Sequence, residues 1–188
     1  MQTLNIAEST PKSEGRIKSL LWPNVENSTD VDYLSAQGLW ICTVVAVVSL
    51  GAGLLFGHPL AGFFIFIYYI VGGMGVREGS IAAAVLVFAF YLLDAFASGV
   101  NIVRIIFSAL LLSNVRAIWL AAHWEPGTEQ TEAPPRLNET LGDKYSDQLP
   151  RWLWPKVRYL YYGFAFIFLI LATAGLIIVF IRGKQHSG

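Results

Sequence analysis

The feature that most constrains this chain is a series of long runs of apolar residues. The first extends from Leu39 to Phe56, LWICTVVAVVSLGAGLLF, and contains no charged residue. A bilayer core of roughly 30 Å needs about 20 helical residues at a rise of about 1.5 Å each, so this run nearly spans it. Residues 60–76, 80–98 and 157–181 form similarly long, predominantly apolar runs, and the first three of the four runs have no polar face. Such runs are typical of membrane-spanning helices.

Composition indicates the same class of protein. Of 188 residues, 55% are hydrophobic and only 14% are charged, which is too apolar for an ordinary soluble domain of this length. The formal net charge is zero and no long block of basic residues is present, so we expect no nucleic-acid partner. We predict an all-α, polytopic integral membrane helical bundle whose surroundings are the lipid bilayer.

Residues 101–122 allow two topologies because this run carries Arg104, Asn114 and Arg116. If it crosses the membrane, the chain has five transmembrane helices. If it lies on the surface as an interfacial amphipathic helix, the chain has four. Lys and Arg concentrate in short cytoplasmic loops, and only the five-helix topology places the basic segment 123–156 on the same side as the basic N-terminal segment. The two arginines also lie near the ends of the run, where long side chains reach the headgroups. We therefore predict five spans.

The predicted organisation has three parts. A cytoplasmic N-terminal segment with an interfacial anchor covers residues 1–38, and a short tail covers residues 182–188 on the opposite side. The transmembrane domain between them, residues 39–181, contains spans at 39–56, 60–76, 80–98, 101–122 and 157–181, with a long cytoplasmic loop at 123–156 that is rich in proline, glycine and charge. We expect a multi-pass protein of a bacterial inner membrane, and no segment identifies a known family.

Two stretches of the chain share the pattern L-W-P-x-V. The first is Leu21-Trp22-Pro23-Asn24-Val25, and the second is Leu153-Trp154-Pro155-Lys156-Val157. With five spans both copies lie at the cytoplasmic face, where tryptophan anchors a chain at headgroup level and proline is tolerated in the first turn of a helix. The repeat is either one anchoring solution used twice or a coincidence between common flanking residues. The predicted interfacial anchors are Trp22, Trp152, Trp154, Tyr159 and Tyr162.

Asp94 is the only acidic residue well inside a predicted span, and an ionisable residue at that depth marks a candidate functional site. It precedes the turn at Gly99 by five residues and Arg104 follows that turn by five, so in an antiparallel hairpin the two meet at similar depth. We predict an ion pair between them. Helical spacing then places a candidate polar cluster along this hairpin, made of Asp94, Ser98, Asn101, Arg104 and Ser108.

This cluster has a structural and a functional interpretation. As a structural ion pair, it would lock two neighbouring spans together, since paired charges are far less costly in lipid than single ones. As a functional group, it would line a polar path for a proton or a cation. A relay usually needs further carboxylates or histidines, and the spans provide none close by.

No pattern of residues predicts a catalytic, cofactor-binding or metal site. His58, His123 and His186 are far apart in the sequence and share no helical spacing of three or four residues. The single cysteine, Cys42, lies inside an apolar run and is typical of a small buried residue.

Three functions are consistent with these features. The leading hypothesis is a non-enzymatic accessory or scaffold subunit that assembles with itself or with another membrane protein, because catalytic groups are lacking and small residues such as Ser49 and Gly53 allow close helix packing. The alternative is a small transporter or channel that uses Asp94 and Arg104 in a polar path. The third is a lipid-acting membrane enzyme, which would draw on His123 and Glu125.

Overall fold

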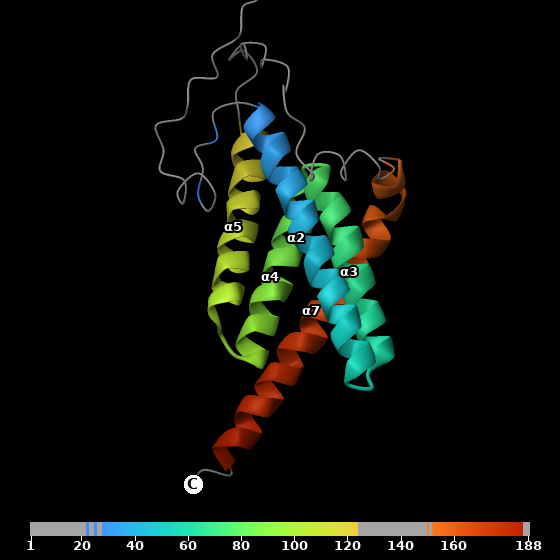
Figure 1. The fold of residues 1–188 in the computed structure, drawn as a ribbon, viewed down its shortest axis with the longest axis vertical. Helices are drawn as coiled ribbons and strands as arrows, with labels where there is room; N and C mark the ends of the chain where they lie inside the picture. The colour runs from blue at the N-terminus through green and yellow to red at the C-terminus, as the bar shows by residue number, and fades with distance from the viewer. Residues whose placement is uncertain (1–21, 23–24, 26–27, 124–149, 151, 186–188) are drawn as a thin grey trace, which may run out of the picture.

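The computed structural model describes Trp22, Val25, residues 28–123, Pro150 and residues 152–185. These residues form five helices, α2 (Ser28–Leu55), α3 (Pro59–Arg77), α4 (Ile81–Ser98), α5 (Ile102–Ala122) and α7 (Leu153–Gln185) (Figure 1). All five are long and apolar enough to cross a membrane, which confirms the predicted all-α class with five spans. The helix at residues 102–122 stands upright beside α2 and α4 and does not lie across one end of the bundle.

Four of the helices form a closed ring, and the fifth packs on its outside. In the ring α2 contacts α3, α3 contacts α4, α4 contacts α5, and α5 returns to α2. The remaining helix, α7, lies against α3 and α4. We call the end where α2 begins the proximal end; α5 ends there and α7 begins there (Figure 1). The α2–α3 and α4–α5 turns lie at the opposite, distal end.

The middle helices have the bounds that the sequence predicts to within a residue, and short capping interactions explain where they begin. Pro59 occupies the first turn of α3, where no backbone N–H donor is needed. The Ser80 hydroxyl accepts a hydrogen bond from the backbone N–H of Ala83, at 3.2 Å, at the start of α4. At the start of α5 the side chain of Asn101 accepts one from the backbone N–H of Arg104, at 2.9 Å.

The outer helices are longer than predicted. We predicted a first span from Leu39, but α2 begins at Ser28, because its first turns also bury side chains such as Leu34 and Ser35 in the bundle. Similarly, α7 begins at Leu153 where we predicted residue 157. Proline is tolerated within its first turn, since backbone N–H groups there have no helical partner. At its other end α7 continues to Gln185, so the first part of the predicted tail is helical. The predicted cytoplasmic loop falls largely on residues 124–149, which lie outside the described residues, as do residues 1–21 and 186–188.

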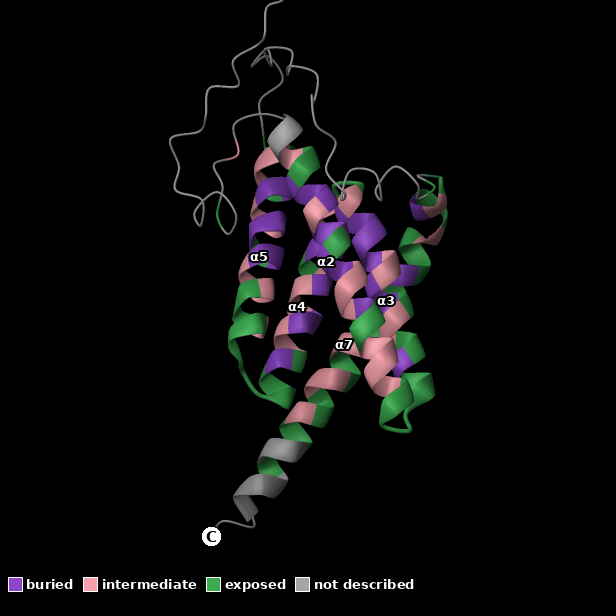
Figure 2. Cartoon of the chain, viewed as in Figure 1, coloured by how far each residue is buried: buried purple, intermediate pink, exposed green. Residues whose placement is uncertain are grey.

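The core is an aromatic cluster that joins α3, α4 and α7. Tyr68 lies at its centre and is fully buried. Its ring centroid is 4.8 Å from that of Phe90, 5.6 Å from that of Tyr161 and 5.8 Å from that of Phe168. The Tyr68 hydroxyl donates a hydrogen bond to the carbonyl oxygen of Leu86, at 2.8 Å, so this buried polar group has a partner. Buried residues are most frequent in the proximal half of the bundle (Figure 2).

Small residues hold the α2–α3 hairpin close. A β-carbon on Gly53 would stand 2.7 Å from the α-carbon of Gly62, a distance that side-chain carbons do not reach. The two helices therefore touch through their backbones near the distal end. This is how small residues strengthen helix contacts in lipid, where van der Waals packing drives association.

Candidate functional site

The predicted ion pair between Asp94 and Arg104 is present at the distal end of the α4–α5 hairpin. Nη2 of Arg104 lies 3.6 Å from Oδ2 of Asp94. The chain reverses through Gly99, whose φ of 91° is readily adopted only by glycine. This tight reversal places the last turn of α4 beside the first turn of α5, at the depth where we expected the two side chains to meet.

The guanidinium of Arg104 also caps the end of α4. Its Nη1 atom donates to the carbonyl oxygens of Asp94 at 3.1 Å, of Ala95 at 3.4 Å and of Gly99 at 3.1 Å. The last carbonyls of a helix have no partner within it, and a cation at this end also interacts favourably with the helix dipole. Arg104 therefore has a structural role that its spacing from Asp94 did not reveal.

Asp94 is the more accessible member of the pair. Its side chain is 50% exposed, against 24% for Arg104. The Ser98 hydroxyl donates to Oδ1 of Asp94 at 3.2 Å, and Asn101 is engaged at the start of α5 as described above. Four of the five predicted cluster residues are thus brought together. The fifth, Ser108, is half-buried further along α5 and does not join them.

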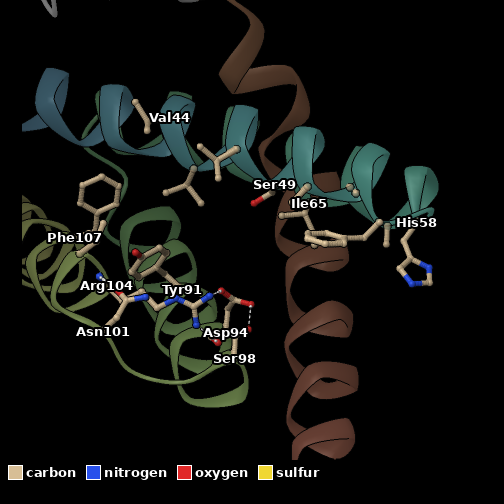
Figure 3. Close-up of a pocket in the computed structure, with 18 residues that line it drawn as sticks. Val44, Ser49, His58, Ile65, Tyr91, Asp94, Ser98, Asn101, Arg104 and Phe107 are labelled. Atoms are coloured by element: carbon tan, nitrogen blue, oxygen red, sulfur yellow. Dashed lines mark hydrogen bonds and ion pairs between the residues drawn. The ribbon is translucent and has the colours of Figure 1, made fainter.

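These four residues line one side of a cleft of about 780 Å³ between the α2–α3 and α4–α5 hairpins (Figure 3). In Figure 3 Asp94, Ser98, Asn101 and Arg104 gather on the α4–α5 hairpin, and Val44 and Ser49 of α2 lie across from them. The apolar lining comes mainly from α2, α3 and α5 and includes Val44, Val45, Val48, Ile65, Val103 and Phe107.

The sequence did not predict that Ser49 and His58 would contribute to the same cleft. We had interpreted Ser49 only as a small packing residue, and His58 only as part of a turn. His58 precedes the first residue of α3 and lies on the α2–α3 side of the cleft, away from Asp94, in Figure 3. Neither position carries a local signal, because the face that α2 turns toward α4 and α5 is decided by packing.

Three of the predicted interfacial anchors are exposed aromatic residues, each with a cation above its ring. The guanidinium carbon of Arg116 lies 5.0 Å from the ring centroid of Trp22. Nζ of Lys156 lies 4.7 Å from the ring centroid of Trp152, and the guanidinium carbon of Arg158 lies 4.6 Å from that of Tyr159. These contacts belong to the proximal end of the bundle, where α5 ends and α7 begins. Paired aromatic and basic side chains of this kind suit the headgroup region.

The other two predicted anchors serve the interior instead. Trp154 is only 6% exposed and packs against Gly75, which corrects its prediction as a surface anchor. Tyr162 is half-buried, and its hydroxyl forms a 2.8 Å hydrogen bond with that of Ser80. The two described tryptophans of the repeated pattern, Trp22 and Trp154, therefore share an end of the bundle but differ in role. Leu21 and Pro23 of the first copy lie outside the described residues.

A second polar region lies buried between α2 and α5 in the proximal half. Asn114 is 1% exposed, and its amide nitrogen donates to the carbonyl oxygen of Leu110 at 2.8 Å. Within the part of the chain that the structure describes, Oδ1 of Asn114 has no hydrogen-bond partner, and neither do the hydroxyl of Ser113 and Oε1 of Gln37. The sequence showed Asn114 only as a polar residue in an ambiguous segment.

The described histidines are not arranged to bind a metal. The ring of His123 stacks on that of Trp119, with centroids 4.4 Å apart, and its Nδ1 lies 2.8 Å from the Trp119 carbonyl oxygen. His186 lies outside the described residues. No group of three His, Cys, Asp or Glu side chains within the described ranges could hold a metal ion.

Comparisons of the chain with protein-family models, with curated proteins and with solved structures find no match. The function is therefore inferred from the arrangement of the residues alone.

Proposed function

We propose that this protein is a non-enzymatic component of a membrane assembly, an accessory or scaffold subunit that associates with itself or with another membrane protein. We further propose that it resides in a bacterial inner membrane with its N-terminus in the cytoplasm. The observation that carries the proposal is the position of α7, whose second half leaves the bundle and extends beyond the distal turns of the other helices (Figure 1).

This part of α7 has little contact with the rest of the chain. The helix contains 33 residues, which at about 1.5 Å each make about 50 Å, more than the roughly 30 Å of a bilayer core. Exposed apolar side chains occur on several sides of it: Phe166, Ile167, Ile170, Leu171, Ile177, Ile178 and Ile181. Of the five candidate spans, α7 has the smallest fraction of buried residues in its apolar part, 11%.

Small residues on α7 would let another helix approach. A β-carbon placed on Gly163 or on Gly175 would meet nothing within 4 Å, in contrast to the crowded glycines of α3. In lipid, helices associate through close van der Waals contact at such small residues. A partner helix along α7 would provide the packing that the other four helices obtain from one another.

The contacts of Arg104 and His123 also favour a structural component over an enzyme. Arg104 is held by the carbonyl oxygens at the end of α4, and His123 by Trp119. The hypothesis of a lipid-acting enzyme relied on His123 together with Glu125, which lies outside the described residues.

Site-directed crosslinking in native membranes tests the proposal. In a Cys42→Ala background, Gly175→Cys is coupled to a maleimide–diazirine photocrosslinker and compared with Ile105→Cys, an exposed position on α5. Contact through α7 predicts a discrete adduct, either a dimer or a complex with another protein, from position 175 and none from position 105. Adducts of equal yield at both positions, or none at either, would contradict the proposal.

Transport is a second candidate, favoured by the cleft that enters the helix ring beside Asp94. The contacts of Arg104 with the end of α4 make it unsuited to move during transport, which leaves Asp94 as the candidate group. Proton and K⁺ flux in reconstituted vesicles distinguishes the two functions. Transport would be favoured if Asp94→Asn abolishes the flux and the control variant Glu78→Gln, at the proximal end of the bundle, leaves it intact. Unchanged flux in both variants would rule out the transport hypothesis.

A further inference from the structure

The cleft between the two hairpins has two chemically different parts. Its apolar walls come mainly from α2, α3 and α5, through residues such as Val44, Val48, Ile65 and Phe107, and α4 adds the ring of Tyr91. Most of its polar lining lies where α4 ends and α5 begins, at Asp94, Ser98, Asn101 and Arg104, while Ser49 and His58 belong to the α2–α3 side. A volume of about 780 Å³ lies in the range of sites that bind small molecules.

The charge that this polar corner presents to an occupant is that of the carboxylate. Arg104 uses Nη1 on three carbonyl oxygens and directs Nη2 to Asp94, and its side chain is 24% exposed. Asp94 is 50% exposed, and its contact with Arg104, at 3.6 Å, is long. A carboxylate has about four acceptor positions, and the hydrogen bond from Ser98 occupies one of them. A cation can therefore bind Asp94 without displacing the arginine.

The depth of the corner indicates what kind of molecule carries that cation. Asp94 lies one turn before the distal end of α4, so in a membrane it stands near headgroup level. The apolar walls extend from there toward the middle of the bundle along α2 and α5. A water-soluble ion would leave these walls unused, whereas an amphiphile matches both parts.

We propose that the cleft binds a membrane lipid with an amine headgroup, with its ammonium group on Asp94 and an acyl chain between the two hairpins. A primary ammonium group can donate hydrogen bonds to the carboxylate, which a quaternary ammonium group cannot. An anionic headgroup is disfavoured, because it would face Asp94 and find Nη1 of Arg104 already engaged. This site is independent of assembly through α7, since α7 does not line the cleft.

Two probes that differ only in headgroup test the proposal on the unaltered protein. The full-length chain, in phosphatidylcholine nanodiscs, is titrated with 11-(dansylamino)undecylamine and with 11-(dansylamino)undecanoate, and the signal of empty nanodiscs is subtracted. The amine probe should bind saturably and at least tenfold more tightly than the carboxylate probe. Phosphatidylethanolamine in the nanodiscs should compete with the amine probe, which identifies the lipid as the occupant.

Three variants locate the site. Asp94→Asn should weaken binding of the amine probe at least tenfold, and Val44→Phe, which fills the cleft and leaves the ion pair intact, should weaken both probes. Glu78→Gln, an exposed acid at the proximal end, should change neither. Equal affinity for the two probes, no saturable binding, or binding that Val44→Phe leaves unchanged would overturn the proposal. Loss of competition by phosphatidylethanolamine alone would reassign the site to a free amine amphiphile.

Discussion

The indole ring of Trp154, at the start of α7, rests directly on the backbone of Gly75 in α3. A β-carbon on Gly75 would stand 2.6 Å from Cζ2 of Trp154 and 2.5 Å from the β-carbon of Ala83 in α4. One glycine therefore lets three helices meet at the proximal end. It also explains why Trp154 is buried although its sequence surroundings are typical of a surface anchor.

This contact makes Gly75→Ala destabilising. The added methyl group must displace an indole ring and a neighbouring helix, so we expect the free energy of unfolding to fall by about 1–3 kcal/mol. Thermal unfolding in detergent measures the change. Gly163→Ala is the matched control, because its β-carbon meets nothing and alanine favours a helix by up to about 1 kcal/mol. Equal effects of the two variants would contradict the packing described here.

Removing the arginine of the distal ion pair should be more harmful than neutralising the carboxylate. Arg104→Met leaves the last carbonyls of α4 without their charged donor, which should lower stability by about 2 kcal/mol. Asp94→Asn removes only a long, half-exposed ion pair, which is worth less than about 1 kcal/mol. Chemical unfolding of both variants in the same detergent gives the comparison. A larger loss from Asp94→Asn would refute the capping role.

Gly38 and Asn114 should be energetically coupled across the α2–α5 interface. A β-carbon on Gly38 would lie 2.7 Å from Oδ1 of Asn114 and 2.7 Å from Cγ1 of Val76. We expect Gly38→Ala to destabilise the protein, and Asn114→Ala in the same chain to restore part of the loss. A double-mutant cycle should give a coupling of about 1 kcal/mol. Strictly additive effects would show that the two residues do not compete for the same space.

The five-span topology places the α4–α5 turn and the start of α7 on opposite sides of the membrane. In a Cys42→Ala background, Val100→Cys and Trp152→Cys introduce thiols at exposed positions of these two segments. A membrane-impermeant maleimide added to sealed cells should label position 100 and should label position 152 only after the membrane is opened. Labelling of both positions from the same side would disprove the topology and the lipid depth assigned to Asp94.

Much of this architecture follows from local sequence. Long, predominantly apolar runs of bilayer length have one stable form in lipid, a helix that satisfies its own backbone hydrogen bonds, so the bounds of α3, α4 and α5 are predictable. The number of spans also required the distribution of Lys and Arg, because α5 carries two arginines. The pairing of Asp94 with Arg104 is predictable for a similar reason. Asp94 and Arg104 are each five residues from Gly99. Because the chain turns tightly there, the two residues lie at the same depth in the hairpin.

The roles of the remaining residues were decided by tertiary packing. Hydropathy alone could not place the start of α2 at Ser28, because the polar turns that precede the apolar run are helical through contact with the bundle. Nor could sequence separate Trp22 from Trp154, since the same residue type anchors a surface in one place and fills the space above a glycine in the other. The cleft depends on the rotation of each helix about its own axis. In a span that is apolar on all sides no sequence pattern fixes that rotation, and only the fit of side chains between neighbouring helices does.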